Sequence, residues 1–155
     1  MTDTAIKVTD CLELFTRREV LTGSESWICP SCDERRDAFK DLGLWRLPRV
    51  LILQLKRFSS DGKTRTKLEE FVDFPLRDLA LEEWASNGAE KGSAYDLFAV
   101  VNHVGGLGGG HYTAFAKDLH SEQWFSFDDA RVAPVPRDRV ASSAAYILFY
   151  RKQIQ

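Results

Sequence analysis

The sequence predicts an α+β fold in which a mostly antiparallel β-sheet dominates and helix is scarce. About five or six segments carry the β-branched, aromatic and alternating apolar residues of strands. One segment close to the N-terminus carries the start signals of a helix. Strands that follow one another with so little helix between them favour antiparallel pairing.

Composition indicates one domain, or part of one, with a substantial core. Hydrophobic residues make up 44% and aromatic residues 12% of the 155 residues, which is too apolar for a disordered chain. The 21 basic and 23 acidic side chains give a net charge of −2, and this balance argues against a nucleic-acid or membrane-surface binder. No apolar run approaches the roughly 20 residues that span a bilayer, and the N-terminus does not resemble a signal peptide. Three cysteines fit a reducing compartment, so we expect a cytoplasmic and/or nuclear protein.

Helix and turn signals come first along the chain. A helix is expected over residues 10–16, where Asp10 can cap the first turn and Glu13 follows three residues later, as in a capping box. Residues 22–26 are expected to form a polar turn. A CxxC motif follows this turn.

Strand signals dominate the remainder of the chain, starting with residues 50–58, where leucines alternate. A polar loop is expected at 59–67, because it contains the turn signal Asp61-Gly62. A short extended piece at 71–75 and a surface loop at 82–94 come next. Four more strands are expected over residues 95–103, 111–117, 124–127 and 145–151, with one helical turn inside 137–143.

A glycine-rich segment separates two of these strands. Its glycines are Gly105, Gly106, Gly108, Gly109 and Gly110. The segment is not a phosphate-binding P-loop, because no Gly-Lys-Ser/Thr follows it and no helix begins after it. It is either a flexible hairpin loop or a loop whose backbone approaches a ligand closely and moves aside for it.

A histidine and two carboxylates form a candidate catalytic group. If strands 111–117 and 124–127 form a hairpin, His111 and Asp128 meet at its outer end. A carboxylate bonded to one imidazole nitrogen fixes the tautomer and leaves the other nitrogen to act as a base. The alternative is that Asp128 and Asp129 serve the turn before Arg131.

The CxxC motif is a candidate half-site for zinc. Cys29 and Cys32 can supply two thiolates from one turn, whereas tetrahedral zinc needs four ligands. None of Cys11, His103 and His120 has a spacing that convincingly supplies the rest. A redox-active CxxC is the alternative, but no βαβ pattern surrounds it.

Several blocks together resemble the ubiquitin-specific proteases, a papain-like family of cysteine deubiquitinases. The blocks GGHYTAF at 109–115 and WFSFDD at 124–129 look like the histidine box of that family. Other family-like blocks, in family order, lie at 10–16, 27–32, 47–48 with 55–58, 72–76, 95–100 and 144–150. The chain is most similar to the second half of a catalytic domain that a long insertion divides. On this basis, residues 1–155 are expected to be the C-terminal portion of such a domain, with a partial zinc-ribbon β-finger at about 20–45 and a palm at 46–155.

The resemblance implies hydrolysis of the isopeptide or peptide bond at the C-terminal glycine of ubiquitin. His111 matches the general base, Asp128 the residue that orients it, and Asp129 a second acidic position that supports the site. The segments at 105–110 and 59–67 match two loops that cover the ubiquitin tail. Ubiquitin, ubiquitinated proteins and an N-terminal half of the catalytic domain are the implied partners.

One departure from the family is large. The nucleophilic cysteine box and the upstream asparagine of these enzymes are both missing, and Cys11 matches a non-catalytic cysteine. The chain alone is therefore expected to be inactive, because a base without a thiolate cannot perform covalent acyl transfer. Cys29 and Cys32 match metal positions, which a second CxxC in the other half would complete. A catalytically inactive ubiquitin-binding module remains the alternative, and the net charge disfavours a zinc-ribbon module for nucleic acid.

Overall fold

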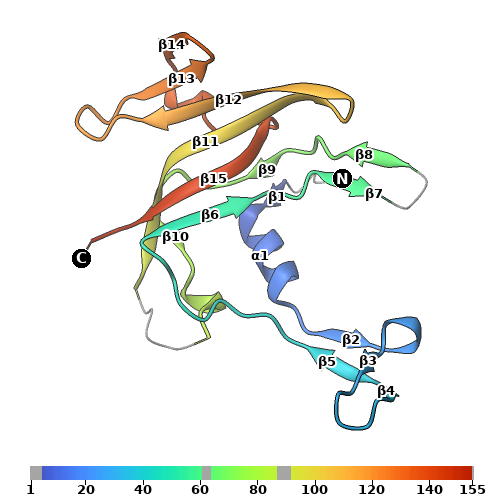
Figure 1. The fold of residues 1–155 in the computed structure, drawn as a ribbon. Helices are drawn as coiled ribbons and strands as arrows, with labels where there is room; N and C mark the ends of the chain where they lie inside the picture. The colour runs from blue at the N-terminus through green and yellow to red at the C-terminus, as the bar shows by residue number, and fades with distance from the viewer. Residues whose placement is uncertain (1–4, 61–63, 87–91, 155) are drawn as a thin grey trace.

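One antiparallel sheet carries most of the regular structure. The computed structural model describes residues 5–60, 64–86 and 92–154. The sheet has seven strands in the order β14-β13-β12-β11-β15-β6, and β10 pairs with β11 beside this path (Figure 1). Their bounds are β6 (Val50–Gln54), β10 (Leu79–Ala80), β11 (Ala94–Gly106), β12 (Gly109–Lys117), β13 (Trp124–Asp128), β14 (Arg131–Pro134) and β15 (Ala145–Lys152). The predicted α+β fold with a mainly antiparallel sheet is confirmed.

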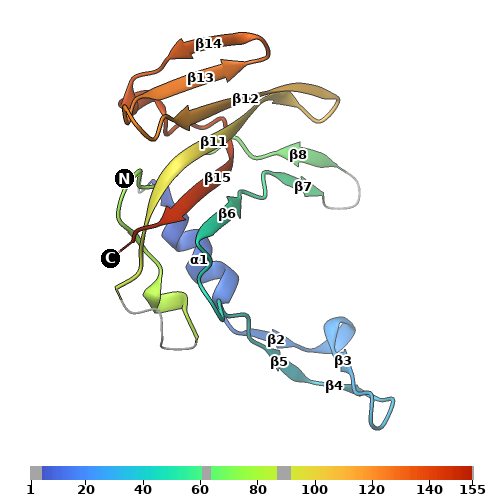
Figure 2. The same ribbon diagram turned by 60° about the vertical axis from the view of Figure 1, so that its left-hand side comes forward.

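Four two-stranded pairs accompany the sheet in the described residues. The pair of β1 (Ile6–Lys7) and β9 (Val72–Asp73) is parallel. The antiparallel pairs are β2 (Glu19–Leu21) with β5 (Ala38–Lys40), β3 (Trp27–Ile28) with β4 (Arg35–Arg36), and β7 (Phe58–Ser60) with β8 (Arg65–Lys67). Figures 1 and 2 show β2 to β5 as an arm that projects away from the sheet. Short 3₁₀ turns cover Gly23–Glu25, Glu82–Trp84 and Arg137–Arg139.

The helix α1 (Val8–Thr16) begins earlier than the sequence predicts. Lys7 is its N-cap residue, and Asp10 lies inside the first turn. The Asp10 carboxylate accepts a hydrogen bond from the Lys7 backbone N–H at 2.8 Å, so Asp10 stabilises the helix start from the third helical position and is not itself the cap. None of the helices in the described part of the chain has the length and apolar character that crossing a bilayer requires.

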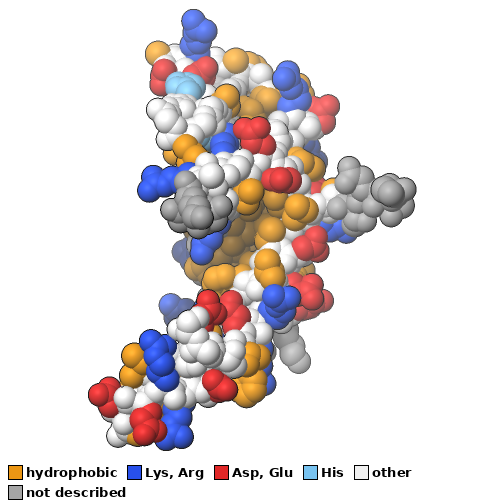
Figure 3. All heavy atoms as spheres, turned by 90° about the vertical axis from the view of Figure 1, so that its right-hand side faces the viewer, with side chains coloured by type: hydrophobic (Ala, Val, Ile, Leu, Met, Phe, Trp, Pro, Cys, Tyr) orange, Lys and Arg blue, Asp and Glu red, His pale blue; other side chains and the backbone are white. Residues whose placement is uncertain are grey.

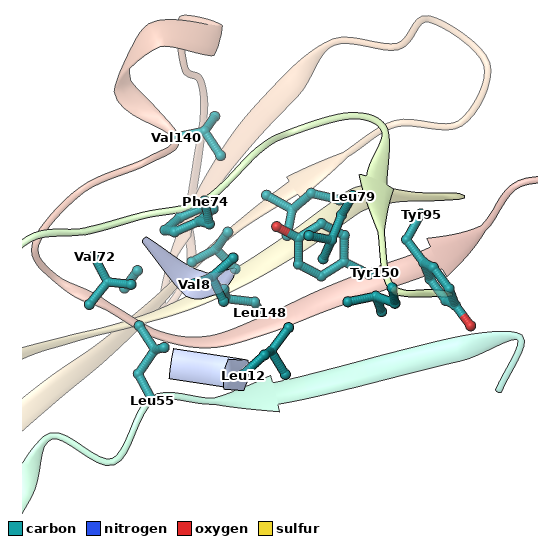
Figure 4. Packing of buried hydrophobic residues seen from close by; sticks show 14 of the residues in the cluster. Val8, Leu12, Leu55, Val72, Phe74, Leu79, Tyr95, Val140, Leu148 and Tyr150 are labelled. Carbon is teal, nitrogen blue, oxygen red and sulfur yellow. The ribbon is translucent and has the colours of Figure 1, made fainter. Parts of the chain in front are cut away.

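The core lies between α1 and the sheet. Val8 and Leu12 of α1 are buried together with Leu148 of β15, and Figure 4 shows these side chains pointing toward one another. Tyr150 is also fully buried, and its hydroxyl donates to the Pro75 carbonyl oxygen at 2.7 Å. Burial raises the pKa of Tyr150, so its phenol stays neutral inside the core.

Two sequence predictions between residues 50 and 67 are wrong. β6 ends at Gln54 and not at residue 58, and the Arg57 N–H donates to the Leu55 carbonyl oxygen at 2.8 Å, a tight turn that places Arg57 inside, where it is 3% exposed. Its guanidinium donates to the carbonyl oxygens of Ala145 at 2.7 Å and Glu70 at 2.9 Å, partners that a buried charge needs. The predicted loop 59–67 contains the β7–β8 pair, and its turn signal Asp61-Gly62 lies outside the described residues.

Truncation of Phe74 tests the position of the core. Phe74 is 2% exposed, so Phe74→Ala should lower the free energy of unfolding by about 3–5 kcal/mol, because it removes buried surface and leaves a cavity. Phe39 of the arm is 67% exposed, and Phe39→Ala is the matched control with an expected change below about 1 kcal/mol. Urea unfolding of both variants gives the two values. Equal losses would show that Phe74 does not lie in the core.

Candidate functional site

His111 and Asp128 lie on neighbouring strands at the same rim of the sheet. β12 and β13 pair antiparallel, with Ala114 opposite Phe127. At the end of this pair the His111 Nε2 atom lies 2.5 Å from Asp128 Oδ1. The structure therefore brings together the two side chains that the sequence places at the outer end of this hairpin.

The Asp128 carboxylate controls the protonation of the His111 imidazole. Its hydrogen bond and its charge raise the pKa of His111 above the ordinary histidine value, and the charge of Asp129 adds to the rise. Because Asp128 accepts the hydrogen bond, Nε2 carries the proton of the neutral ring and Nδ1 presents its lone pair. The side chains are 50% and 48% exposed, so a reacting group can reach the pair from solvent.

Asp129 occupies the turn between β13 and β14. Its φ of 49° is left-handed, a conformation that aspartate tolerates better than most residues. Ligand atoms of His111, Asp128 and Asp129 lie within 4.8 Å of one another, a grouping that could also hold a cation. The hydrogen bond between Nε2 and Oδ1 already joins two of these groups, and this bond favours the histidine–carboxylate pair.

The glycine-rich segment is a hairpin, as one of the two sequence interpretations has it, but its strands extend further into the segment than the sequence predicts. β11 continues to Gly106 and β12 begins at Gly109, so Gly105 lies opposite Gly110 across the ladder. Gly105 has a φ of 104°, which requires glycine. A Cβ atom on Gly110 would lie 2.2 Å from His103 Nε2, so this position also requires glycine. We call residues 105–110 the glycine hairpin.

A cleft of about 320 Å³ lies beside the glycine hairpin. Its lining residues are Phe58, His103, Gly106, Leu107, Gly109, Gly110 and Tyr112. His103 is 5% exposed, and its Nδ1 atom has no hydrogen-bond partner in the described part of the chain. The Phe58 and Tyr112 rings lie 5.6 Å and 4.8 Å from the His103 ring, between centroids. From the sequence, His103 is a candidate only for a metal ligand. The signal that could place it at this cleft is the predicted pairing of its strand with the strand that begins at His111, because such pairing brings His103 opposite Tyr112.

Cys29 and Cys32 lie on the turn between β3 and β4. The Asp33 N–H donates to the Cys29 carbonyl oxygen at 2.8 Å, which closes this turn. Backbone N–H groups of Ser31 and Cys32 bind the Cys29 sulfur and lower the pKa of its thiol, and this donor set suits a metal-bound thiolate. In the described residues, neither Cys11 nor another third ligand joins the two cysteines.

An imidazole hydrogen-bonded to a carboxylate, at the rim of an antiparallel sheet and beside a cleft, is an arrangement that covalent or general-base chemistry can use. The sequence model of the ubiquitin carboxyl-terminal hydrolase family matches residues 11–150. The chain belongs to this family, and the resemblance to ubiquitin-specific proteases is confirmed.

Relatives and solved structures agree with this assignment. Human ubiquitin carboxyl-terminal hydrolase 15 is 48% identical over 148 residues, which are 96% of this chain and 15% of the relative. Ubiquitin carboxyl-terminal hydrolase 5 of Arabidopsis thaliana is 49% identical over 144 residues, 92% of this chain and 16% of the relative. A chain of the SAGA deubiquitinase module solved with ubiquitin aldehyde has a TM-score of 0.81 at 34% identity, over 99% of this chain and 35% of that chain. The chain thus spans about one sixth of the length of these curated relatives and about a third of the similar structure.

Proposed function

We propose that this chain is part of a cysteine-type deubiquitinase, which hydrolyses the isopeptide or peptide bond at the C-terminal glycine of ubiquitin. The observation that carries the proposal is the hydrogen bond between His111 Nε2 and Asp128 Oδ1. In this role His111 is the general base, Asp128 orients it, and Asp129 supports the negative charge of the site. Family membership and the similarity to a deubiquitinase module solved with ubiquitin aldehyde support ubiquitin as the substrate.

The nucleophile has to come from another segment. Cys11 is half-buried on α1, where burial raises the pKa of its thiol, and the other two cysteines lie on the arm. Such a segment could pack against the face shown in Figure 3, because hydrophobic side chains gather in the hollowed centre of this face. An N-terminal half of the catalytic domain is the proposed partner on this face.

The chemistry follows from the free Nδ1 atom of His111. The incoming thiol gives its proton to Nδ1, and its sulfur bonds to the carbonyl carbon of the last ubiquitin glycine. The imidazolium, which Asp128 stabilises, then gives the proton to the leaving amine. Water next adds its hydroxyl to the acyl carbon and gives its proton to Nδ1, the carbon–sulfur bond breaks, and the released thiolate takes the proton back from Nδ1. Atoms and charge balance over the two steps.

The cleft beside the glycine hairpin is the proposed channel for the ubiquitin tail. The tail ends in two glycines, so a narrow channel between Tyr112 and the hairpin can select it. Residues 46–155 then form the palm, and residues 20–45 form part of a finger that holds zinc. The proposed location remains cytoplasmic and/or nuclear.

A chimera tests the function directly. In this chimera, the present chain replaces the matched 148-residue segment of human ubiquitin carboxyl-terminal hydrolase 15. We expect it to release a fluorophore from the C-terminus of ubiquitin, whereas the relative without the segment should not. A folded chimera that cleaves nothing would contradict the proposal.

The second candidate is a catalytically inactive ubiquitin-binding module. It is favoured by the absence of a cysteine from the cluster around His111 in the described residues. A chimera that binds ubiquitin with an unchanged affinity but without turnover would support this candidate.

Zinc binding is the next prediction. Cys29 and Cys32 fit zinc by their donor type and turn, and the remaining two ligands would come from the other half of the finger. We expect Cys29→Ser to reduce the zinc content of the chimera by about one ion per molecule, because serine does not replace a thiolate ligand. Cys11→Ser is the matched control with no loss. Atomic emission gives both contents, and zinc retained in Cys29→Ser would contradict the half-site.

The protonation of His111 can be measured in the chain itself. The pKa of His111 should lie above the usual value of about 6.5, and Asp128→Asn should lower it toward that value. A raised folded-state pKa means that the charged pair stabilises the fold below about pH 6.5, and that this contribution is lost as the pH rises through the folded-state pKa. NMR titration of the imidazole checks the direction. An unchanged pKa in Asp128→Asn would rule out Asp128 as the controlling charge.

A further inference from the structure

One lysine joins the β7–β8 pair to the glycine hairpin. Lys67, the last residue of β8, donates from Nζ to the carbonyl oxygen of Gly105 at 2.7 Å and to that of His103 at 3.1 Å. Its side chain is only 11% exposed, and the Glu69 carboxylate lies 3.7 Å from Nζ. Figures 1 and 2 show β7 and β8 alongside the hairpin end of β11 and β12.

The two carbonyls face an edge of β11 where its strand partner ends. β15 pairs with β11 as far as Ala145 opposite Asn102, and the His103 N–H then donates to the Ala144 carbonyl oxygen at 2.9 Å. Carbonyls two residues apart in a strand point to the same edge, so those of His103 and Gly105 form a pair beyond the end of β15. The Lys67 ammonium takes the place that a neighbouring strand would fill.

A second contact joins the same two elements. The Phe58 ring of β7 meets the His103 ring edge-on, at 5.6 Å between centroids. Gly105, which Lys67 binds, lies opposite Gly110, and Gly110 immediately precedes His111. The β7–β8 pair therefore contacts the backbone of the hairpin at Gly105 and, just before the hairpin, the His103 ring of β11.

We propose that Lys67 is a positioning residue that holds the glycine hairpin over the ubiquitin-tail cleft. This inference rests on the proposed function, which assigns the cleft to the tail. Without the ammonium, the carbonyls of His103 and Gly105 lose their donor, and the hairpin samples other arrangements. Apparent affinity falls with the fraction of molecules in the competent arrangement, so tail binding should weaken about tenfold.

Hydrogen exchange of the 155-residue chain tests the structural half without any ubiquitin. We expect Lys67→Met to speed the exchange of backbone amides in residues 104–110 about tenfold. Lys67→Arg keeps donors at this place and should retain most of the protection. The matched control is Lys117→Met, since Lys117 is 9% exposed on β12 and pairs with Glu122 at 3.2 Å, away from the hairpin. Equal exchange in wild type and Lys67→Met would overturn the proposal, whatever the function of the cleft.

Ubiquitin affinity tests the functional half with the same variants. Lys67→Met should bind ubiquitin about tenfold more weakly than wild type, and Lys67→Arg within about threefold of it. Ubiquitin that lacks its last four residues should bind wild type and Lys67→Met equally. An equal weakening for tail-less ubiquitin would show a general structural role and overturn positioning. If wild type does not distinguish the two ubiquitins, the assignment of the cleft fails, while the exchange result still decides whether Lys67 holds the hairpin.

Discussion

His111→Ala in the chimera should abolish turnover, with kcat reduced by roughly 10⁴- to 10⁶-fold. The substitution removes the imidazole base that the site offers to a thiol, because Nδ1 is the ring atom that Asp128 does not bind. Affinity for ubiquitin should change less than about threefold, since the imidazole contributes little to the docking surface. Fluorogenic cleavage gives kcat, and calorimetry of the same protein gives the affinity.

His120→Ala is the control for this substitution. His120 lies in the turn between β12 and β13, at the opposite end of the strand that begins beside His111. This variant should keep wild-type turnover. If His111→Ala retains an intact rate, the assignment of the base is wrong, and a rate lost together with ubiquitin affinity would indicate a structural role.

Asp128→Asn should lower kcat by about 10²- to 10⁴-fold, less than the loss of His111. An asparagine keeps the size of the side chain but removes the charge that raises the pKa of His111 and stabilises its imidazolium. It also allows the other tautomer, in which the proton lies on Nδ1. The activity that remains should therefore shift to lower pH, because the imidazole in this variant has a lower pKa.

Asp129→Asn is the matched comparison, one residue along the chain. Asparagine tolerates the left-handed backbone at this position, where φ is 49°, so the variant should fold normally. Its charge is the smaller influence on His111, and we expect a loss of less than about tenfold. If Asp129→Asn proves more damaging than Asp128→Asn, the roles of the two carboxylates are reversed.

The long strands and the histidine–carboxylate pair could be predicted because local sequence determines them. β11, β12 and β15 are apolar over many residues, and a short turn joins β12 to β13, so the approach of His111 to Asp128 follows from simple hairpin geometry. The sequence does not predict β14, because Pro134 ends it and proline disfavours a strand; it is tolerated there since β14 is an edge strand.

The remaining features depend on contacts between distant parts of the chain. β1 and β9 are each two residues long, and they form because Ile6 meets Val72. The role of Lys67 depends on carbonyls that lie more than 30 residues away in sequence, as their separations of 36 and 38 show. The glycines predict a loop between two strands, whereas pairing of Gly105 with Gly110 and of Gly106 with Gly109 extends both strands into that loop. The β1–β9 pairing and the contacts of Lys67 join residues that are far apart in the sequence, so a local sequence pattern does not predict them.

The central claim is that His111 and Asp128 activate a thiol that another segment supplies. Two separately expressed polypeptides test it: this chain, and the part of human ubiquitin carboxyl-terminal hydrolase 15 outside the matched segment. They are mixed with ubiquitin that carries a thiol-reactive C-terminus, and mass spectrometry identifies which polypeptide gains the mass of ubiquitin. We predict that the human polypeptide gains it only when this chain is present with His111 intact, and that this chain never does. A ubiquitin adduct on Cys11, Cys29 or Cys32, or equal labelling with His111→Ala, would contradict the account.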